Sequence, residues 1–299
     1  LTATNVDNRK GIVKLNNGLS GNVNSTGNLG TLRLDGNNNQ TVTGDVKVGN
    51  IDSGIAGTTS TFNKTVNSQN ITNTGTGTTN FKDNVIATNV NVNDGISNFE
   101  KGLTATTTTI KDGTGNFNTV SGSTQSDIVF TGNGTANLHG NLTGDIDFAG
   151  NDAVVNVSHK KGIFGSIQTL ANNTGIVNYQ GDGEITGNIG GKIGADYYGI
   201  RELNINTNNQ QNSGGTGVIV AYDALAREIY ADVINLRNNA TLTLKDNVNL
   251  INTGLDNNII KVDVGNTGKI SFEGTSNIEG EVGESAKAVN TINAGAAGK

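Results

Sequence analysis

Proline, cysteine, methionine and tryptophan are all absent from this chain of 299 residues. Proline lacks the backbone N–H that a central β-ladder needs, and it is concentrated in loops, edge strands and helix starts. Its absence therefore favours a backbone whose donors are nearly all committed to long ladders. The absence of cysteine excludes disulfides and thiol chemistry. It fits a surface protein that crosses an outer membrane unfolded, and it also fits a cytosolic protein that happens to lack cysteine.

Aromatic residues make up only 4% of the chain. This scarcity predicts a thin, aliphatic core, because a wide sandwich core usually contains more large rings. There is no run of about 20 apolar residues and no recognisable signal peptide, so we expect no membrane-spanning helix. The net charge of -6 argues against nucleic acid and against a polybasic membrane patch. Both ends of the sequence look cut, and we expect a piece of a longer protein.

Glycine and asparagine are abundant instead, with 43 Gly and about 50 Asn, and both tolerate positive φ in turns. Their even distribution predicts many turns and many short strands. Most strand candidates alternate apolar with polar residues, as half-buried strands do. A further segment, Tyr222–Tyr230, is interpreted as a strand or a one-turn cap. The clearest strand candidates are Val42–Val48, Ala153–Val157, Glu202–Ile205, Gly217–Tyr222, Ala240–Leu244, Ile259–Val264 and Lys269–Glu273.

A degenerate repeat recurs along the chain without helices between its copies, which is typical of a solenoid. We expect an all-β fold, an elongated, right-handed, single-stranded parallel β-helix. At about 22 residues and three short strands per coil, it would have about 13 coils. Asn at equivalent turns would stack into side-chain ladders. Residues 1–130 would form looser Thr- and Asn-rich coils and residues 131–299 more regular ones, with no true boundary between them. Copies of the repeat are Gly21–Gly36, Gly140–Gly150, Gly187–Gly194 and Gly280–Gly295.

Few residues suggest chemistry. Asp145 and Asp147 would project from one face of a strand about 7 Å apart, a separation that suits glycosidase carboxylates, and Asp152 lies nearby. The alternative is a solvated strand face with Ile146 and Phe148 turned inward. The two histidines, His139 and His159, are not in a metal-binding spacing, and we interpret them as turn residues.

Three glycine-rich or aromatic motifs have weak functional interpretations. Gly187–Gly194 superficially resembles a phosphate-binding loop, but no convincing helix follows it. Gly181–Glu184 resembles calcium-binding nonapeptides without their tandem repetition. The pair Tyr197–Tyr198 is either a contact patch or the cover of a bend, and we favour a structural role. The sequence therefore predicts no catalytic, cofactor-binding or metal-binding residues, and no cofactor.

Recurrent Gly-Asn-[Ile/Leu]-x-Gly-x-[Ile/Val] units give the chain a resemblance to the passenger regions of rickettsial surface cell antigens, outer-membrane proteins A and B. The units stand out in Leu142–Gly150 and Ile185–Gly191, and the resemblance is strongest from about residue 115 onward. It implies a type V autotransporter, a surface-displayed β-helical passenger exported through its own C-terminal β-barrel. It also implies adhesion to host cells and their invasion, but it supplies no binding residues.

We therefore expect a non-enzymatic segment of a bacterial surface protein, associated with the outer membrane and monomeric. It would act as an adhesin that contacts a host-cell protein or glycan, or as a coat or stalk. The longest turns are the candidate contact regions, near Asn208–Gly217 and Lys192–Arg201. Two alternatives stay open. One is a β-helical polysaccharide lyase or glycoside hydrolase that uses Asp145 and Asp147, and the other is a trimeric fibre segment of the phage or pilus type.

Overall fold

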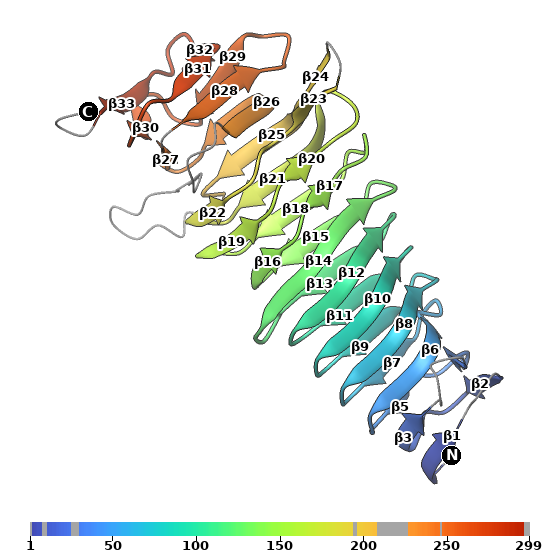
Figure 1. The fold of residues 1–299 in the computed structure, drawn as a ribbon. Helices are drawn as coiled ribbons and strands as arrows, with labels where there is room; N and C mark the ends of the chain where they lie inside the picture. Colours follow the sequence, from blue (N-terminus) through green and yellow to red (C-terminus); the bar gives the residue numbers. More distant parts are fainter. Residues whose placement is uncertain are drawn as a thin grey trace. The chain divides into compact units, whose positions relative to one another are not determined.

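The computed structural model describes residues 2–7, 11–24, 30–193, 196–207, 227–245 and 247–295. In this part of the chain the fold is all-β without a helix, and parallel strands stack as a β-solenoid of about 12 turns (Figure 1). The predicted parallel β-helix is confirmed, with a turn count close to the one expected. The chain divides into two compact units, unit 1 (Leu1–Thr143) and unit 2 (Gly144–Lys299).

Unit 1 consists of parallel coils whose strands belong to two sheets. One sheet contains β1 (Thr2–Asp7), β2 (Ile12–Leu15), β3 (Ser20–Asn24), β4 (Thr31–Leu34), β6 (Val46–Ser53), β8 (Val66–Asn73), β10 (Val85–Val92), β12 (Leu103–Ile110), β14 (Ser123–Phe130) and β16 (Asn141–Thr143). The other sheet contains the short strands β5 (Gln40–Val42), β7 (Thr59–Phe62), β9 (Thr78–Phe81), β11 (Ile96–Phe99), β13 (Thr114–Phe117) and β15 (Thr135–Leu138).

Each regular coil of unit 1 joins two of the three expected strands into one. The first half of β6 pairs with β3, where Val46 lies opposite Val23. The second half pairs with β4, where Ile51 lies opposite Leu32. One eight-residue strand therefore forms two sides of the coil, and a four-residue strand forms the third. Successive coils are offset by 20, 19 or 18 residues, slightly fewer than the expected 22.

A column of phenylalanine rings runs through the core of unit 1, which differs from the aliphatic core expected from composition. Phe62, Phe81, Phe99 and Phe117 stack with centroid separations of 5.1, 5.0 and 5.4 Å. All four are at most 1% exposed. The column is possible because the strands are in strict register, so that one inward position recurs in every coil. Half of the eight phenylalanines of the chain are thus placed in one stack.

Small side chains line the core beside these rings. The inward position two residues before each ring holds Ser60, Thr79, Ser97 and Gly115 in successive coils. A Cβ on Gly115 would come within 2.7 Å of the Phe117 ring. The ring therefore lies over its small neighbour, and larger residues at these positions would overpack the core.

Asparagine ladders form, as the composition predicted, but they lie on the outside of strands and not at the turns where we expected them. Asn80, Asn98, Asn116 and Asn137 are joined by Nδ2–H···Oδ1 bonds of 2.7, 2.6 and 2.7 Å. A second ladder in unit 1 joins Asn50, Asn70 and Asn89. Unit 2 has its own ladder, which joins Asn156, Asn178, Asn204 and Asn235. Each inner amide both donates to one coil and accepts from the next, so the ladders lock the coil register.

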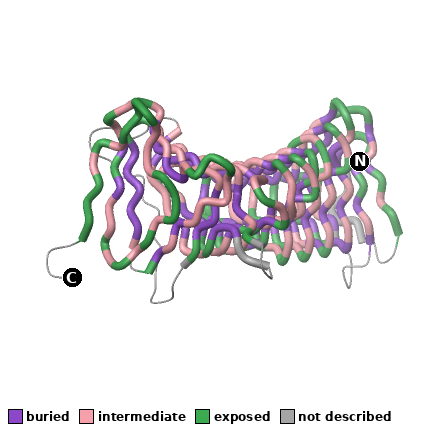
Figure 2. Tube along the Cα trace, turned by 90° about the horizontal axis from the view of Figure 1, so that it is seen from above, coloured by how far each residue is buried: buried purple, intermediate pink, exposed green. Residues whose placement is uncertain are grey.

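Turns contain many of the remaining asparagines and much of the glycine. Most described non-glycine residues with positive φ are Asn, among them Asn118 at 59° and Asn206 at 64°. Glycine is required where the turns of neighbouring coils touch. At Gly95, with φ of 62°, a Cβ would lie 2.3 Å from the Gly77 carbonyl oxygen. Along many strands, buried positions alternate with intermediate or exposed ones (Figure 2).

Sequence periodicity placed most strands correctly but failed at Val42–Val48. In the structure β5 ends at Val42 and β6 begins at Val46. Gly44 turns the chain between them and donates its N–H to the Gly21 carbonyl at 3.1 Å. The alternation of valines continues across this turn, so pattern alone could not reveal it. The candidate Gly217–Tyr222 lies outside the described residues, as does Tyr222–Ala226 of the uncertain segment. The rest of that segment is strand.

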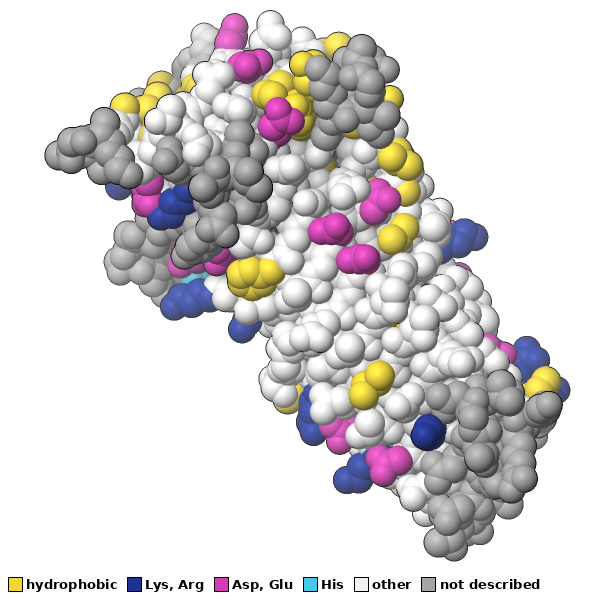
Figure 3. Space-filling model, viewed as in Figure 1, with side chains coloured by type: hydrophobic (Ala, Val, Ile, Leu, Met, Phe, Trp, Pro, Cys, Tyr) yellow, Lys and Arg dark blue, Asp and Glu magenta, His cyan; other side chains and the backbone are white. Residues whose placement is uncertain are grey.

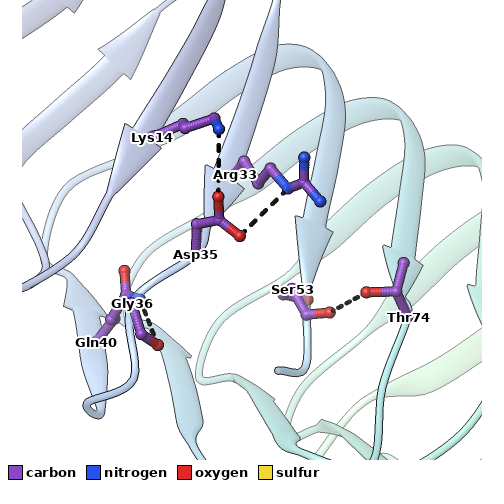
Figure 4. Close-up of polar contacts among 7 residues, drawn as sticks. All are labelled: Lys14, Arg33, Asp35, Gly36, Gln40, Ser53 and Thr74. Carbon is purple, nitrogen blue, oxygen red and sulfur yellow. Dashed lines mark hydrogen bonds and ion pairs between the residues drawn. The ribbon is translucent and has the colours of Figure 1, made fainter. Parts of the chain in front are cut away.

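The surface of the first coils is tied by charged and polar pairs. Asp35 lies between Lys14 and Arg33, each with a nitrogen 3.5 Å from one of its carboxylate oxygens (Figure 4). The Thr74 hydroxyl donates to the Ser53 carbonyl at 3.2 Å. The Lys14–Asp35 and Thr74–Ser53 contacts fasten one coil to the next, whereas Arg33 and Asp35 lie two residues apart in the same coil.

Unit 2 continues with parallel coils, and one hairpin interrupts them. The hairpin is β23 (Gly191–Ile193) with β24 (Asp196–Tyr198), paired antiparallel. A separate parallel sheet holds β27 (Thr241–Leu244), β30 (Thr267–Phe272) and β33 (Val289–Ala294). The other strands are β17 (Ile146–Asp147), β18 (Val154–Val157), β19 (Lys161–Phe164), β20 (Ile167–Gln168), β21 (Thr174–Tyr179), β22 (Gly183–Ile185), β25 (Ile200–Ile205), β26 (Arg227–Leu236), β28 (Val248–Asn252), β29 (Asn258–Val262), β31 (Asn277–Glu279) and β32 (Glu281–Val282).

The coil offset rises and then falls along unit 2. Consecutive members of its asparagine ladder are 22, 26 and 31 residues apart, whereas Asn235 pairs with Lys261, 26 residues later, and Lys269 pairs with Thr291, 22 residues later. The 26-residue step between Asn178 and Asn204 contains the β23–β24 hairpin, whose residues leave the coil between strands.

Candidate functional site

The three carboxylates singled out in the sequence are engaged by backbone groups or by arginine. Asp145 Oδ1 accepts the Ser166 N–H at 2.7 Å from the next coil. Asp147 Oδ1 accepts the N–H of Ala149 at 2.7 Å. Asp152 Oδ2 lies 2.7 Å from Arg201 Nη1.

The inward neighbours of Asp145 and Asp147, which are Ile146 and Phe148, are fully buried. This is the strand-face arrangement that the alternation predicted. Each of the first two carboxylates fastens a backbone N–H of a turn or of the next coil. This gives both of them a structural role.

The histidines do not come together. His159 Nδ1 accepts the Asp182 N–H from the next coil at 3.1 Å, and His139 is an exposed residue that follows β15. Among the described residues no group of three or more His, Asp or Glu side chains is placed to hold a metal ion. The interpretation of both histidines as turn residues agrees with these positions.

The glycine-rich motifs serve coil packing. A Cβ on Gly187 would lie 2.2 Å from the Gly165 carbonyl oxygen, so this glycine allows two turns to touch. Gly183 lies under the ring of Tyr179, where a Cβ would be 2.0 Å from Cδ1. The Tyr179 hydroxyl donates to the Glu184 carbonyl at 2.9 Å, and burial raises the pKa of the Glu184 carboxyl.

The β23–β24 hairpin is fixed to the solenoid at both of its ends. At the first end, Gly190 donates its N–H to the Ile167 carbonyl at 2.7 Å. A Cβ on Gly190 would come within 2.7 Å of Tyr230 Cβ. At the second end, Gly199 donates its N–H to Asn172 Oδ1 at 2.9 Å. Glycine at both ends lets the hairpin lie directly against β26, which both of its strands contact.

The hairpin covers an outward-facing tyrosine. Along β26, Ile229 and Ala231 face the core, so Tyr230 faces outward, yet it is only 1% exposed. Tyr197 of the hairpin stacks on it with ring centroids 5.2 Å apart and an interplanar angle of 27°. Tyr197 itself remains 45% exposed. The tyrosine pair expected at 197–198 therefore covers the sheet and also presents a ring to solvent.

Carboxylates surround the stacked rings. The Tyr230 hydroxyl donates to Glu228 Oε2 at 2.6 Å. Burial, followed by this hydrogen bond, raises the pKa of Tyr230. Glu279 occupies the same register position as Tyr230 two strands away, because Tyr230 lies opposite Ile251 and Ile251 lies opposite Glu279. At a strand spacing of about 4.8 Å, the two positions are about 10 Å apart.

We call Tyr197, Tyr230, Glu228 and Glu279 the tyrosine patch. Both of its carboxylates are exposed. In the view of Figure 1, hydrophobic and acidic side chains lie close to one another on unit 2, on a surface that is otherwise mostly uncharged (Figure 3). The ion pairs of unit 2 that involve described side chains lie elsewhere, at Asp152–Arg201, Lys245–Glu273, Lys261–Asp256 and Lys261–Glu284.

Sequence reasoning named part of this site and missed the rest. The candidate segment Lys192–Arg201 contains the hairpin, whereas Asn208–Gly217 lies outside the described residues. Tyr230 and its acidic neighbours were not expected. The available signal was three tyrosines, at 197, 198 and 230, in a chain that has only five.

Comparisons with known proteins add no assignment: no family model, no curated protein and no solved structure matches the chain. The described residues also contain no helix with the length and apolarity needed to span a bilayer.

Proposed function

We propose that this chain is a non-enzymatic segment of a bacterial surface protein, a β-helical autotransporter passenger that acts in adhesion to host cells. The observation that carries the proposal is the hairpin. Among the described strands, β23 and β24 are the pair that runs antiparallel, and they present an aromatic side chain to solvent. Solenoids bind their partners through such exposed surfaces on a rigid stack, and aromatic side chains are enriched at binding hot spots.

The architecture suits export as an unfolded chain. Each coil contacts only its neighbours, so the stack can form progressively as the chain emerges. No disulfide is needed, because register is held by ladders such as Asn80–Asn98–Asn116. Progressive stacking and the absence of disulfides support the surface location that the rickettsial antigen resemblance implies. These two features fit an adhesin and a surface coat or stalk equally, whereas the hairpin favours the adhesin.

The alternative of a polysaccharide-cleaving enzyme has less support from the geometry. It would need Asp145 and Asp147 to act on a substrate, whereas each already accepts a short backbone hydrogen bond. Asp145→Asn keeps an acceptor oxygen and should leave the fold intact. Turnover of a polysaccharide by the wild-type chain that this variant abolishes would establish the enzyme instead. A trimer in sedimentation analysis would establish the fibre alternative.

Bead attachment tests the proposal. Latex beads coated with the folded chain are counted on cultured mammalian cells, against beads coated at equal density with a β-helical segment that has no binding activity. We expect saturable attachment that free chain competes away. Attachment no better than the control would reject the adhesin and leave the stalk or coat.

A further inference from the structure

We propose that the tyrosine patch recognises a cationic segment of a partner protein, in which an arginine side chain stacks on Tyr197. This inference depends on the proposed adhesive function and adds the chemistry of the partner. Its physical basis is a partly exposed aromatic ring, a rigid support beneath it and two exposed carboxylates near that support.

The support makes the ring a preformed platform. Tyr197 rests on the buried Tyr230, and Tyr230 is held by its hydrogen bond to Glu228. The hairpin itself is bonded to the coils at Gly190 and Gly199. A ring fixed in this way loses little conformational entropy when a ligand stacks on it. Rigid aromatic anchors are the residues that give interfaces most of their affinity.

The surrounding charge selects the sign of the partner. Glu228 accepts a hydrogen bond from Tyr230, and Glu279 accepts one from Asn277 at 3.3 Å. Neither carboxylate forms an ion pair with a described side chain, as the pairs of unit 2 involve other acids. The two therefore place negative charge beside the aromatic platform. An anionic glycan would be repelled here, whereas a cation would be attracted to both the ring face and the carboxylates.

The geometry favours arginine over lysine and a peptide over a lone cation. A planar guanidinium stacks on an aromatic face and donates to carboxylates at the same time, which an ammonium does less well. The register positions of Tyr230 and Glu279, about 10 Å apart, are about the length of three extended residues. In an extended segment, basic residues at alternate positions point to the same face and are about 7 Å apart. The long, flexible basic side chains span the remaining ~3 Å, so one would lie on Tyr197 and another at Glu279.

The test measures binding of two fluorescent peptides to the intact chain at physiological salt, by anisotropy. One peptide alternates arginine with serine, and the other alternates lysine with serine at the same length. We expect the arginine peptide to bind more tightly. Tyr197→Ala should weaken it about fivefold, and the double variant Glu228→Gln/Glu279→Gln about three- to tenfold. Circular dichroism verifies that each variant keeps its β-sheet signal.

Two matched controls separate the patch from diffuse charge. Phe164→Ala removes an aromatic side chain that is 38% exposed elsewhere in unit 2. Glu281→Gln removes an exposed carboxylate outside the patch. Both should bind the arginine peptide as the wild type does. Equal losses in patch and control variants, or no measurable binding by the wild type, would overturn the proposal. So would binding of a neutral oligosaccharide that survives the double glutamine change.

The same variants on beads distinguish this inference from the proposed function. If Tyr197→Ala beads attach to cells as wild-type beads do, the patch is not the contact surface, and adhesion by another face stands. If wild-type beads fail to attach while the arginine peptide still binds at the patch, adhesion is rejected and the patch chemistry stands.

Discussion

Replacing Phe99 by alanine should destabilise unit 1 more than any change on its surface. Phe99 is 1% exposed and lies between the rings of Phe81 and Phe117, with centroids 5.0 and 5.4 Å away. Truncation of a buried phenylalanine to alanine costs about 3–5 kcal/mol. This includes two stacked contacts that contribute about 0.5–1.5 kcal/mol each beyond area burial. The closed parallel coils leave the neighbouring rings little freedom to collapse into the space, so we expect the upper part of this range.

Urea denaturation followed by circular dichroism measures the loss. With an m value of about 3 kcal/mol/M, the transition midpoint should fall by about 1 M or more. Because a solenoid is stabilised by nearest-neighbour contacts, hydrogen exchange should accelerate most in β9, β11 and β13. Phe164→Ala, on a ring that is 38% exposed, is the matched control and should cost far less. Equal midpoints for the two variants would refute the aromatic column as a source of stability.

Three further predictions concern turns, ladders and charge. Gly54→Ala should lower the free energy of unfolding by about 1–3 kcal/mol more than Gly57→Ala does. Both glycines have positive φ, but of the two only Gly54 lacks room for a Cβ. Thermal melting of the two variants compares their stabilities. Asn98→Asp should destabilise the fold by about 1–3 kcal/mol at neutral pH, because it replaces a ladder donor by a charge, and should recover as acidification restores a donor. An NMR titration should find the pKa of Asp83 below that of an ordinary aspartate, since its hydrogen bond to Lys101 lowers it, and Lys101→Gln should raise it. That lowered pKa contributes stability above the unfolded-state value of about 3.9, which is lost as pH falls through the folded value.

Each of these predictions has a contrary result. Equal melting temperatures for Gly54→Ala and Gly57→Ala would mean that the surrounding coil gives way to the new methyl group. An Asn98→Asp variant whose stability does not change with pH would mean that the ladder donor is unimportant. If the pKa of Asp83 is the same in the wild type and in Lys101→Gln, solvent screens the contact between the two side chains.

The sequence was sufficient for the architecture because every coil repeats the same requirement. Alternation along short strands, turns rich in Gly and Asn, and the absence of proline all indicate one parallel stack, and Asn80, Asn98 and Asn116 form the ladder that their abundance suggested. The fusion of two strands in β6 was not predictable, since Gly49 and Asn50 look like a turn. The phenylalanine column could have been predicted, because Phe62, Phe81 and Phe99 recur at the coil period. Each of the three is followed within two residues by lysine.

The tyrosine patch was beyond sequence reasoning for a different reason. Tyr197 and Tyr230 are brought together by a hairpin that folds back over the outside of β26, and no local period encodes that return. The position of the hairpin explains why residues 190 and 199 are glycine, because at Gly190 and Gly199 its backbone touches the coils and leaves no room for a Cβ. Sites that depend on departures from a repeat are hidden from an analysis of the repeat.

Competition of bead attachment by the soluble chain bears most directly on adhesion. Beads coated with this chain are mixed with cultured mammalian cells and increasing amounts of free wild-type chain, and in parallel with free Tyr197→Ala chain. If the chain is an adhesin that contacts cells through the tyrosine patch, bead attachment should be saturable and free wild-type chain should abolish it. Free Tyr197→Ala chain should compete about fivefold less effectively. Attachment at the level of beads coated with a non-binding β-helical segment would contradict the adhesive function itself.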